Sequence, residues 1–224
     1  MKMFSLDPND NHAESGNPQV SITEYDTYGN FYSNIVRDPG GNSSVNIKVS
    51  TYNNNWESVN FYNNLIYGGA IAGFYIYPST LSKNTTINFY SNSVYGNNSG
   101  PLINIDIVNV PYNVDIKNNI IYQAGSGSCI DPCTSMDSSC TRLPEHSYNL
   151  YYAPAGKVSR TSRFVLDALT EINANPFWQA VPSGAYTSSM AALTSVSPAI
   201  DKGFSLSSLF DNDFVNVSRP QGSG

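Results

Sequence analysis

The chain has 224 residues, which is enough for one domain with a continuous core. Its net charge of −6 and pI near 4.7 argue against a nucleic-acid partner, because the phosphate backbone requires a basic surface. No apolar run is long enough to span a membrane, and no basic amphipathic segment suits a membrane surface.

Residues 1–19 are polar and rich in turn-forming residues, so we expect an N-terminal cap or a disordered lead. The stretch Met1–Gly16 lacks the apolar core of a signal peptide. The sequence itself therefore shows no export signal.

Residues 20–152 contain a recurring eight-residue motif. It reads NFYSNIVR at Asn30–Arg37, NFYNNLIY at Asn60–Tyr67, NFYSNSVY at Asn88–Tyr95 and DIKNNIIY at Asp115–Tyr122, with a fainter copy at Glu145–Tyr152. The fifth position is asparagine in every copy: Asn34, Asn64, Asn92, Asn119 and Asn149. Spacings of 27 to 30 residues are typical of stacked coils.

Alternating apolar residues predict three short strands in each coil, separated by turns. Two lie within the motif, and the third follows at Val20–Tyr25, Val45–Ser50, Gly73–Tyr77 and Ile103–Asn109. The motif asparagine is predicted to be the bend residue, because asparagine tolerates left-handed dihedral angles. Stacked coils would bring the five asparagine amides into hydrogen-bond contact. The pattern predicts a parallel β-helix.

The repeat is interrupted by a loop at residues 124–145, which holds all three cysteines: Cys129, Cys133 and Cys140. One hypothesis is a zinc site completed by His146, although the spacings differ from those of a zinc knuckle. The favoured hypothesis is one disulfide with one thiol left over, without an assigned pairing.

Residues 153–224 have a different character. Apolar residues at spacings of three and four predict a short helix at Phe164–Ile172, which Asn175-Pro176 would end. The irregular, apolar remainder is predicted to pack along and over the C-terminal end of the stack.

The repeat resembles the right-handed parallel β-helix family of pectate-lyase-like proteins, whose coils carry an inward asparagine ladder. The tail resembles the end of a group of secreted bacterial β-helix proteins, through NPFW at Asn175–Trp178, SPAIDKG at Ser197–Gly203, DNDF at Asp211–Phe214 and RPQG at Arg219–Gly222. Asn175 departs from the aspartate usual in that group. The resemblance implies an all-β, right-handed solenoid of about five or six coils with a short-helix or irregular C-terminal segment. It also implies an extracellular or cell-surface location.

In lyases of this fold, the resemblance implies a substrate groove along the sheet formed by the third strand of each coil. Its outward residues here are predicted to be Lys48, Tyr75 and Asp106, with Tyr77 and Asn104 beside them. In a β-elimination, Lys48 or Tyr75 would take the proton beside a uronate carboxylate, while Asp106 would hold Ca²⁺ or orient the sugar. The calcium-dependent lyases use clustered acids, and this face offers one.

A row of tyrosines is the second candidate site. Tyr32, Tyr62 and Tyr90 occupy the same outward position in consecutive coils. Aromatic rows suit contact with sugar rings, and they also stabilise β-sheets through cross-strand pairs. A further row is formed by Arg37, Tyr67, Tyr95 and Tyr122.

These patterns favour a carbohydrate-binding β-helix protein whose catalytic status is open. The alternatives are an enzyme, either a polysaccharide lyase on an acidic polysaccharide or a glycoside hydrolase, and a structural spacer or cap of a larger surface protein. Exposed edge strands leave both a monomer and a dimer open.

Overall fold

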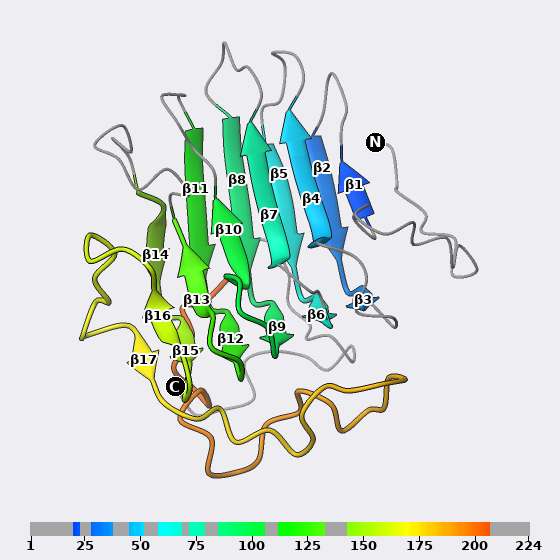
Figure 1. Ribbon diagram of the computed structural model, residues 1–224, viewed down its shortest axis with the longest axis vertical. Coiled ribbons are helices and arrows are strands. Elements are labelled where there is room, and N and C mark those ends of the chain that lie inside the picture. The colour runs from blue at the N-terminus through cyan, green and yellow to red at the C-terminus, as the bar shows by residue number, and fades with distance from the viewer. Residues whose placement is uncertain are drawn as a thin grey trace.

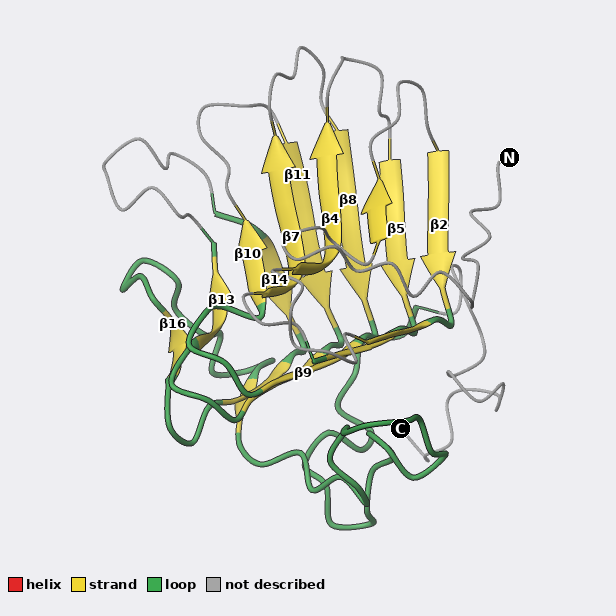
Figure 2. Ribbon diagram, turned by 45° about the vertical axis from the view of Figure 1, so that its right-hand side comes forward, coloured by secondary structure: helices red, strands yellow, loops and turns green. Residues whose placement is uncertain are grey.

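The computed structural model describes residues 20–22, 28–37, 45–51, 58–68, 72–78, 85–105, 112–132 and 143–206. Within these ranges the chain winds into a solenoid with three parallel sheets, and each coil contributes one strand to each sheet (Figures 1 and 2). Hydrogen-bonded neighbours are three strands apart in sequence, except β15 and β17 at the C-terminal end of the third sheet, which are two apart. This order confirms the predicted parallel β-helix. No helix in the described ranges is long and apolar enough to cross a membrane.

Sheet A is formed by β1 (Val20–Ile22), β4 (Val45–Thr51), β7 (Ala72–Pro78), β10 (Ile103–Ile105), β13 (Ser128–Asp131) and β16 (Lys157–Ser159). Sheet B is formed by β2 (Tyr28–Tyr32), β5 (Ser58–Tyr62), β8 (Thr85–Tyr90), β11 (Tyr112–Lys117) and β14 (Glu145–Ser147). Sheet C is formed by β3 (Ile35–Arg37), β6 (Leu65–Tyr67), β9 (Ser93–Gly96), β12 (Ile120–Gln123), β15 (Leu150–Tyr152) and β17 (Ile172–Asn173).

The core fills the space between the three sheets, because alternate residues of each strand point inward. Phe61 and Phe89 from sheet B both contact Phe74 from sheet A, with ring centroids 4.8 and 4.5 Å apart. All three rings are almost fully buried. The core residues therefore pack between sheets as well as from coil to coil, and their burial stabilises the fold.

The predicted asparagine ladder is confirmed at the bend between sheets B and C. The side-chain N–H of each asparagine donates to the carbonyl oxygen of the next, for example Asn64 to Asn92 at 2.9 Å and Asn119 to Asn149 at 2.9 Å. The second side-chain N–H reaches a backbone carbonyl of the previous coil, as from Asn92 to Phe61 at 3.0 Å. These bonds satisfy polar groups that would otherwise be buried without partners.

The prediction that these asparagines adopt the left-handed bend conformation is wrong, because the bend lies one residue earlier. The left-handed residues are those directly before the ladder, Ser33, Asn63, Ser91, Asn118 and Tyr148, with φ between 52° and 59°. The chain turns at that position, and the asparagine that follows is thereby aimed into the interior. The ladder residue thus serves as a hydrogen-bonding group, and its predecessor absorbs the backbone strain.

The turn between sheets C and A is closed by stacked glycines. A Cβ on Gly127 would lie 1.9 Å from the Gly100 carbonyl oxygen, and one on Gly156 would lie 1.9 Å from that of Gly127. Successive coils therefore approach each other through bare backbone at this corner, which only glycine allows.

The predicted helix at Phe164–Ile172 is wrong. The segment contains a single turn, in which the N–H groups of Thr170 and Glu171 donate to the Asp167 carbonyl at 3.2 and 2.8 Å. Phe164 is buried against the last coil, whereas Leu169 is 94% exposed. The chain leaves this turn and enters β17 at Ile172, so the apolar residues of the segment do not line up on one face of a helix.

Residues 174–206, here called the strap, run back along sheet C instead of only covering the end of the stack (Figure 2). Antiparallel and parallel bridges, Trp178–Leu193 and Ala180–Met190, tie the strap to itself. Its last described part returns across the bend between sheets B and C, where the Asn118 amide bonds Phe204.

Candidate functional site

The outer face of sheet B carries two parallel rows of polar side chains, here called the tyrosine–asparagine strip. One row is Asn30, Asn60 and Asn88, and the other is Tyr32, Tyr62 and Tyr90; β2, β5 and β8 pair these residues in register. Their neighbours Phe31, Phe61 and Phe89 point into the core. The alternation of the strands therefore places the strip on the outer face of the sheet, where Tyr32 is exposed and Tyr90 is buried.

The strip is ordered by contacts along the solenoid axis. The rings of Tyr32 and Tyr62 are parallel within 3°, with centroids 4.9 Å apart. The Asn60 amide donates to Asn30 at 2.8 Å, and the Asn88 amide donates to Asn60 at 2.7 Å. Because these two rings face each other, they present their edges and hydroxyls to a partner. Tyr32 is 42% exposed.

The strip ends in a charged group at β11. The Tyr90 hydroxyl donates to Asp115 at 2.7 Å, and the Lys117 ammonium lies 2.6 Å from the same carboxylate oxygen. Glu145 pairs in register with Asp115 on the next strand. Burial, followed by the hydrogen bond to Asp115, raises the pKa of Tyr90 well above its usual value. Tyr90 therefore stays a neutral donor and anchors this end of the strip.

The other predicted site lies on the outer face of sheet A. The structure places Lys48, Tyr75 and Asn104 at paired positions on β4, β7 and β10, so they form one row along the axis. Asp106 and the side chain of Tyr77 lie outside the described residues.

The same row continues to Asp131, an acid that sequence reasoning missed. Asp131 pairs with Asn104, is only 3% exposed and lies 3.5 Å from the Arg160 guanidinium. Aligning Ile130 of the cysteine loop with Ile103 would have revealed it. The row therefore carries one acid whose charge is already balanced by an arginine.

Cys129 is a free, fully buried thiol on β13. Its Sγ donates to the Ile121 carbonyl at 3.4 Å, and burial raises the pKa of the thiol to about 12. Cys133 and Cys140 lie outside the described residues, so the disulfide prediction stays open for them. His146 contacts Glu171, and no group of three or more His, Cys, Asp or Glu side chains is placed for a metal in the described part of the chain.

The second row of tyrosines, on sheet C, is covered by the strap. Trp178 contacts Tyr95 and Tyr122, with ring centroids 6.2 and 5.5 Å apart. The Tyr67 hydroxyl donates to the Gly184 carbonyl at 3.1 Å. These tyrosines hold the strap, and the strip on sheet B is the row that keeps an exposed ring.

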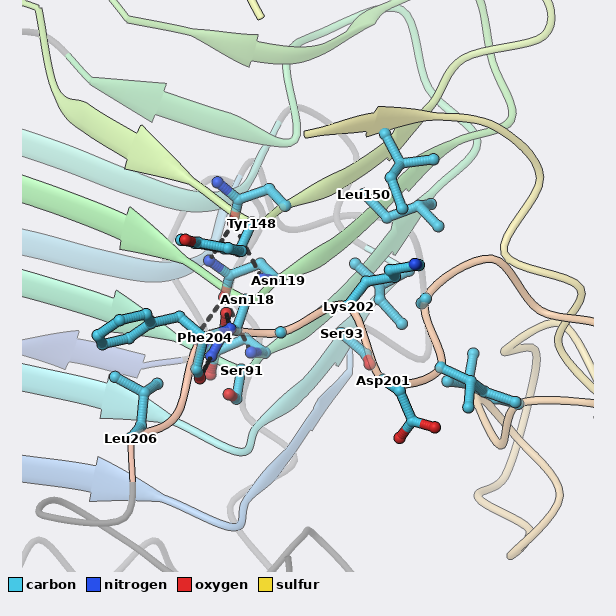
Figure 3. A pocket seen from close by; sticks show the side chains of 18 of the residues that line it. Ser91, Ser93, Asn118, Asn119, Tyr148, Leu150, Asp201, Lys202, Phe204 and Leu206 are labelled. Atoms are coloured by element: carbon cyan, nitrogen blue, oxygen red, sulfur yellow. Dashed lines mark hydrogen bonds between the residues drawn. The ribbon is translucent and has the colours of Figure 1, made fainter. Parts of the chain in front are cut away.

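A pocket of about 580 Å³ lies between the strap and the bend of sheets B and C (Figure 3). Its floor comes from sheet C, including Ser93, Ile120 and Leu150, and its roof comes from strap residues Ile200–Leu206. Two bonds fix the strap here: the Phe204 N–H donates to the Asn118 side-chain oxygen at 2.7 Å, and the Asn118 amide donates back to the Phe204 carbonyl at 2.6 Å.

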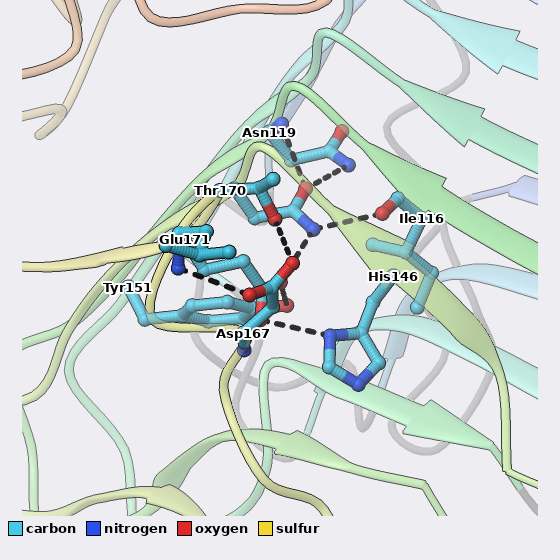
Figure 4. A network of polar contacts seen from close by, with 9 residues as sticks. Ile116, Asn119, His146, Tyr151, Asp167, Thr170 and Glu171 are labelled. Carbon is cyan, nitrogen blue, oxygen red and sulfur yellow. Dashed lines mark hydrogen bonds and ion pairs between the residues drawn. The ribbon is translucent and has the colours of Figure 1, made fainter.

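A buried polar network closes the last coil (Figure 4). Glu171 accepts bonds from the Asn149 side chain at 3.1 Å, the Tyr151 hydroxyl at 3.2 Å and the Asp167 N–H at 2.9 Å. His146 Nδ1 lies 2.9 Å from the same carboxylate, and its ring stacks on Phe164 at 4.1 Å. All four contacts satisfy a carboxylate that would otherwise be buried without partners.

No family model, curated protein or solved structure matches this chain. Function is therefore argued from the side chains themselves, since a solenoid fold alone carries no activity. The strip offers neutral donors and acceptors on a repeating face, the sheet A row offers a lysine and a tyrosine, and the strap encloses a largely apolar pocket.

Proposed function

We propose that the protein binds a polysaccharide along the tyrosine–asparagine strip. The observation that carries this proposal is the regular pair of rows, the Tyr32–Tyr62 ring stack beside the Asn30–Asn60–Asn88 amide chain. Asn60 and Asn88 each donate one N–H within the row, so the second N–H and a carbonyl lone pair of each remain to contact a partner. Sugar hydroxyls can both accept such an N–H and donate to such a carbonyl.

The axial repeat supports a polymeric partner. Successive rungs are separated by the inter-strand spacing of about 4.8 Å, which is close to the length of one sugar unit in an extended chain. A glycan lying along the solenoid axis would meet an equivalent amide at each unit and the ring edges of Tyr32 and Tyr62. Weak contacts repeated in this way add up in a long ligand.

Beyond the fold, we propose that the chain is related to pectate-lyase-like, right-handed β-helix proteins that are secreted by bacteria. The asparagine ladder and the SPAIDKG and RPQG motifs support it. An extracellular or cell-surface location follows from the same relationship, and edge strands keep both a monomer and a dimer within the proposal.

A binding experiment tests the strip directly. The protein is passed through affinity gels that contain neutral or acidic polysaccharides, and its retardation is compared with that of Tyr32→Ala. The matched control is Phe177→Ala on the strap, since Phe177 is 46% exposed and Tyr32 is 42% exposed. Retardation that is lost only in Tyr32→Ala supports the proposal, and equal retardation of both variants contradicts it. No retardation on any gel would favour the spacer.

The second candidate function is a lyase, favoured by the register that puts Lys48 beside Tyr75 on adjacent strands. The proposed roles remain proton abstraction by Lys48 or Tyr75 and Ca²⁺ or sugar contact by Asp106. Incubation with uronate polysaccharides, with and without Ca²⁺, would show rising absorbance from an unsaturated product. A signal that Lys48→Ala does not remove would exclude Lys48 as the base.

A further inference from the structure

The floor of the pocket under the strap includes the one position on sheet C where a small residue replaces a large apolar one. The residue directly after each ladder position lies in one column: Ile35, Leu65, Ser93, Ile120, Leu150 and Ile172. Ser93 is the single small, polar member of this column. Leu65, one coil earlier, packs against Met190 of the strap, whereas the space above Ser93 stays open.

The walls of this pocket are mainly apolar. Ile120, Leu150 and Ile172 line it from sheet C, and Leu193 and Ile200 line it from the strap. Small-molecule sites typically combine such walls with a few polar groups that fix the orientation of the ligand, and they have volumes of about 300–1,000 Å³. The size and lining of the pocket fit that description.

One polar group of the pocket is a donor without an acceptor. The Ser91 hydroxyl is shielded from solvent and has no hydrogen-bond partner among the described residues. A buried hydroxyl without a partner is unfavourable, so this position favours a bound acceptor. Ser93 adds a second hydroxyl to the same wall.

Lys202 supplies the charge. In Figure 3 its ammonium lies on the side of Leu150, whereas the carboxylate of Asp201 points away to the opposite side. No carboxylate of the described residues lies within ion-pair distance of this ammonium. The pocket lining therefore offers an ammonium that forms no ion pair with a described residue, together with two hydroxyl donors.

We propose that this pocket binds a small carboxylate with an apolar body, of which a medium-chain alkanoate is the simplest example. The alkyl chain would lie against Ile120 and Leu150, and the carboxylate would meet Lys202 and the serine hydroxyls. The site lies around the bend from the tyrosine–asparagine strip. It does not depend on glycan binding, so either proposal can fail alone.

The first test is calorimetry with octanoate as the probe, and with octanol and octylammonium as probes of the same length. We expect saturable binding of octanoate to one site and no saturable binding of octylammonium. Lys202→Gln should weaken octanoate binding about tenfold, while the matched control Lys157→Gln, another exposed lysine, leaves it unchanged. Octanol binding as tight as that of octanoate would overturn the role of the charge.

The second test varies Ser93. Leucine at this position copies Leu65 and fills the pocket, so Ser93→Leu should abolish octanoate binding while the circular dichroism spectrum stays native. Ser93→Ala keeps the space and should retain most of the affinity. Two outcomes overturn the proposal: no saturable binding of octanoate together with a raised unfolding midpoint in Ser93→Leu, which marks a packing void, or binding of glucuronate without binding of octanoate.

Discussion

The carboxylate of Glu171 is the last rung of the asparagine ladder. Its Oε1 accepts the Asn149 side-chain N–H at 3.1 Å, just as the Asn149 oxygen accepts that of Asn119 at 2.9 Å. Glu171 also directly precedes β17, as each ladder asparagine precedes its own strand of sheet C. A carboxylate accepts bonds and offers none, so the ladder ends here.

Replacement of Glu171 should destabilise the C-terminal coil. Glu171→Gln would turn an N–H₂ group toward donors such as Asp167 N–H, so we expect a loss of about 1–3 kcal/mol. Glu171→Ala would leave several buried donors unpaired and should cost about 3 kcal/mol or more. Urea unfolding measures both, with the exposed Glu145→Gln as control. An unchanged midpoint in Glu171→Ala would show that the network does not support the fold.

The cost of removing a ladder asparagine should depend on its position. Asn92 is buried, and its oxygen accepts from both the backbone and the side chain of Asn64 at 3.0 and 2.9 Å. We expect Asn92→Ala to cost about 3 kcal/mol or more, because these donors lose their acceptor. Asn34, at the first described rung, is only partly buried, so Asn34→Ala should cost less. Equal losses in urea unfolding would contradict this gradient.

Two glycine substitutions separate close approach from backbone strain. Gly127→Ala forces a Cβ against the Gly100 carbonyl and should prevent the two coils from stacking. Gly184 has φ of +57° and no neighbour within 4 Å, so Gly184→Ala should cost only about 1–2 kcal/mol. Thermal unfolding followed by circular dichroism compares the variants. A larger loss in Gly184→Ala would refute the stacking argument.

The buried thiol of Cys129 should be unreactive in the folded protein. We expect its modification by a thiol reagent at pH 8 to be at least about 100-fold slower than in urea, because it requires unfolding. Mass mapping of the labelled peptides separates Cys129 from Cys133 and Cys140. Fast labelling of Cys129 in native buffer would contradict the buried placement.

The same thiol predicts a dependence of stability on pH. The pKa of the Cys129 thiol is raised from 9.0 to about 12 in the folded protein. The stabilising contribution of the protonated thiol to the free energy of unfolding is therefore complete below about pH 9 and is lost as the pH rises toward 12. In Cys129→Ala, the free energy of unfolding should fall less steeply across that interval than in the wild type. The difference between the two slopes isolates Cys129 from the tyrosines that titrate nearby. Identical slopes would be incompatible with a raised pKa.

Sequence periodicity was sufficient to predict the solenoid, because Asn34 through Asn149 repeat at the length of one coil. It could not place the left-handed residue, since that position is occupied by three different residue types: Ser33 and Ser91, Asn63 and Asn118, and Tyr148. Glu171 was missed because it follows Asn149 by 22 residues and is not an asparagine. The helix prediction at Phe164–Ile172 failed because Phe164 packs into the last coil while Leu169 faces solvent.

The candidate sites were predictable only where they repeat. The tyrosine–asparagine strip could be read from the eight-residue motif, and so could the register of Lys48 with Tyr75. The pocket could not, because it depends on the path of the strap and on the bonds between Asn118 and Phe204. The coverage of Tyr95 and Tyr122 by Trp178 depends on the same path.

The direction of the ladder has a consequence for how such a chain can change its length. Each inner rung both gives and receives one amide bond, so a duplicated unit of 27 residues, such as Ser93–Asn119, would find matching partners above and below. Duplication or deletion of whole coils can therefore lengthen or shorten the protein at any inner rung. Growth beyond Glu171 would meet a rung that has nothing to donate, which makes this end a fixed stop.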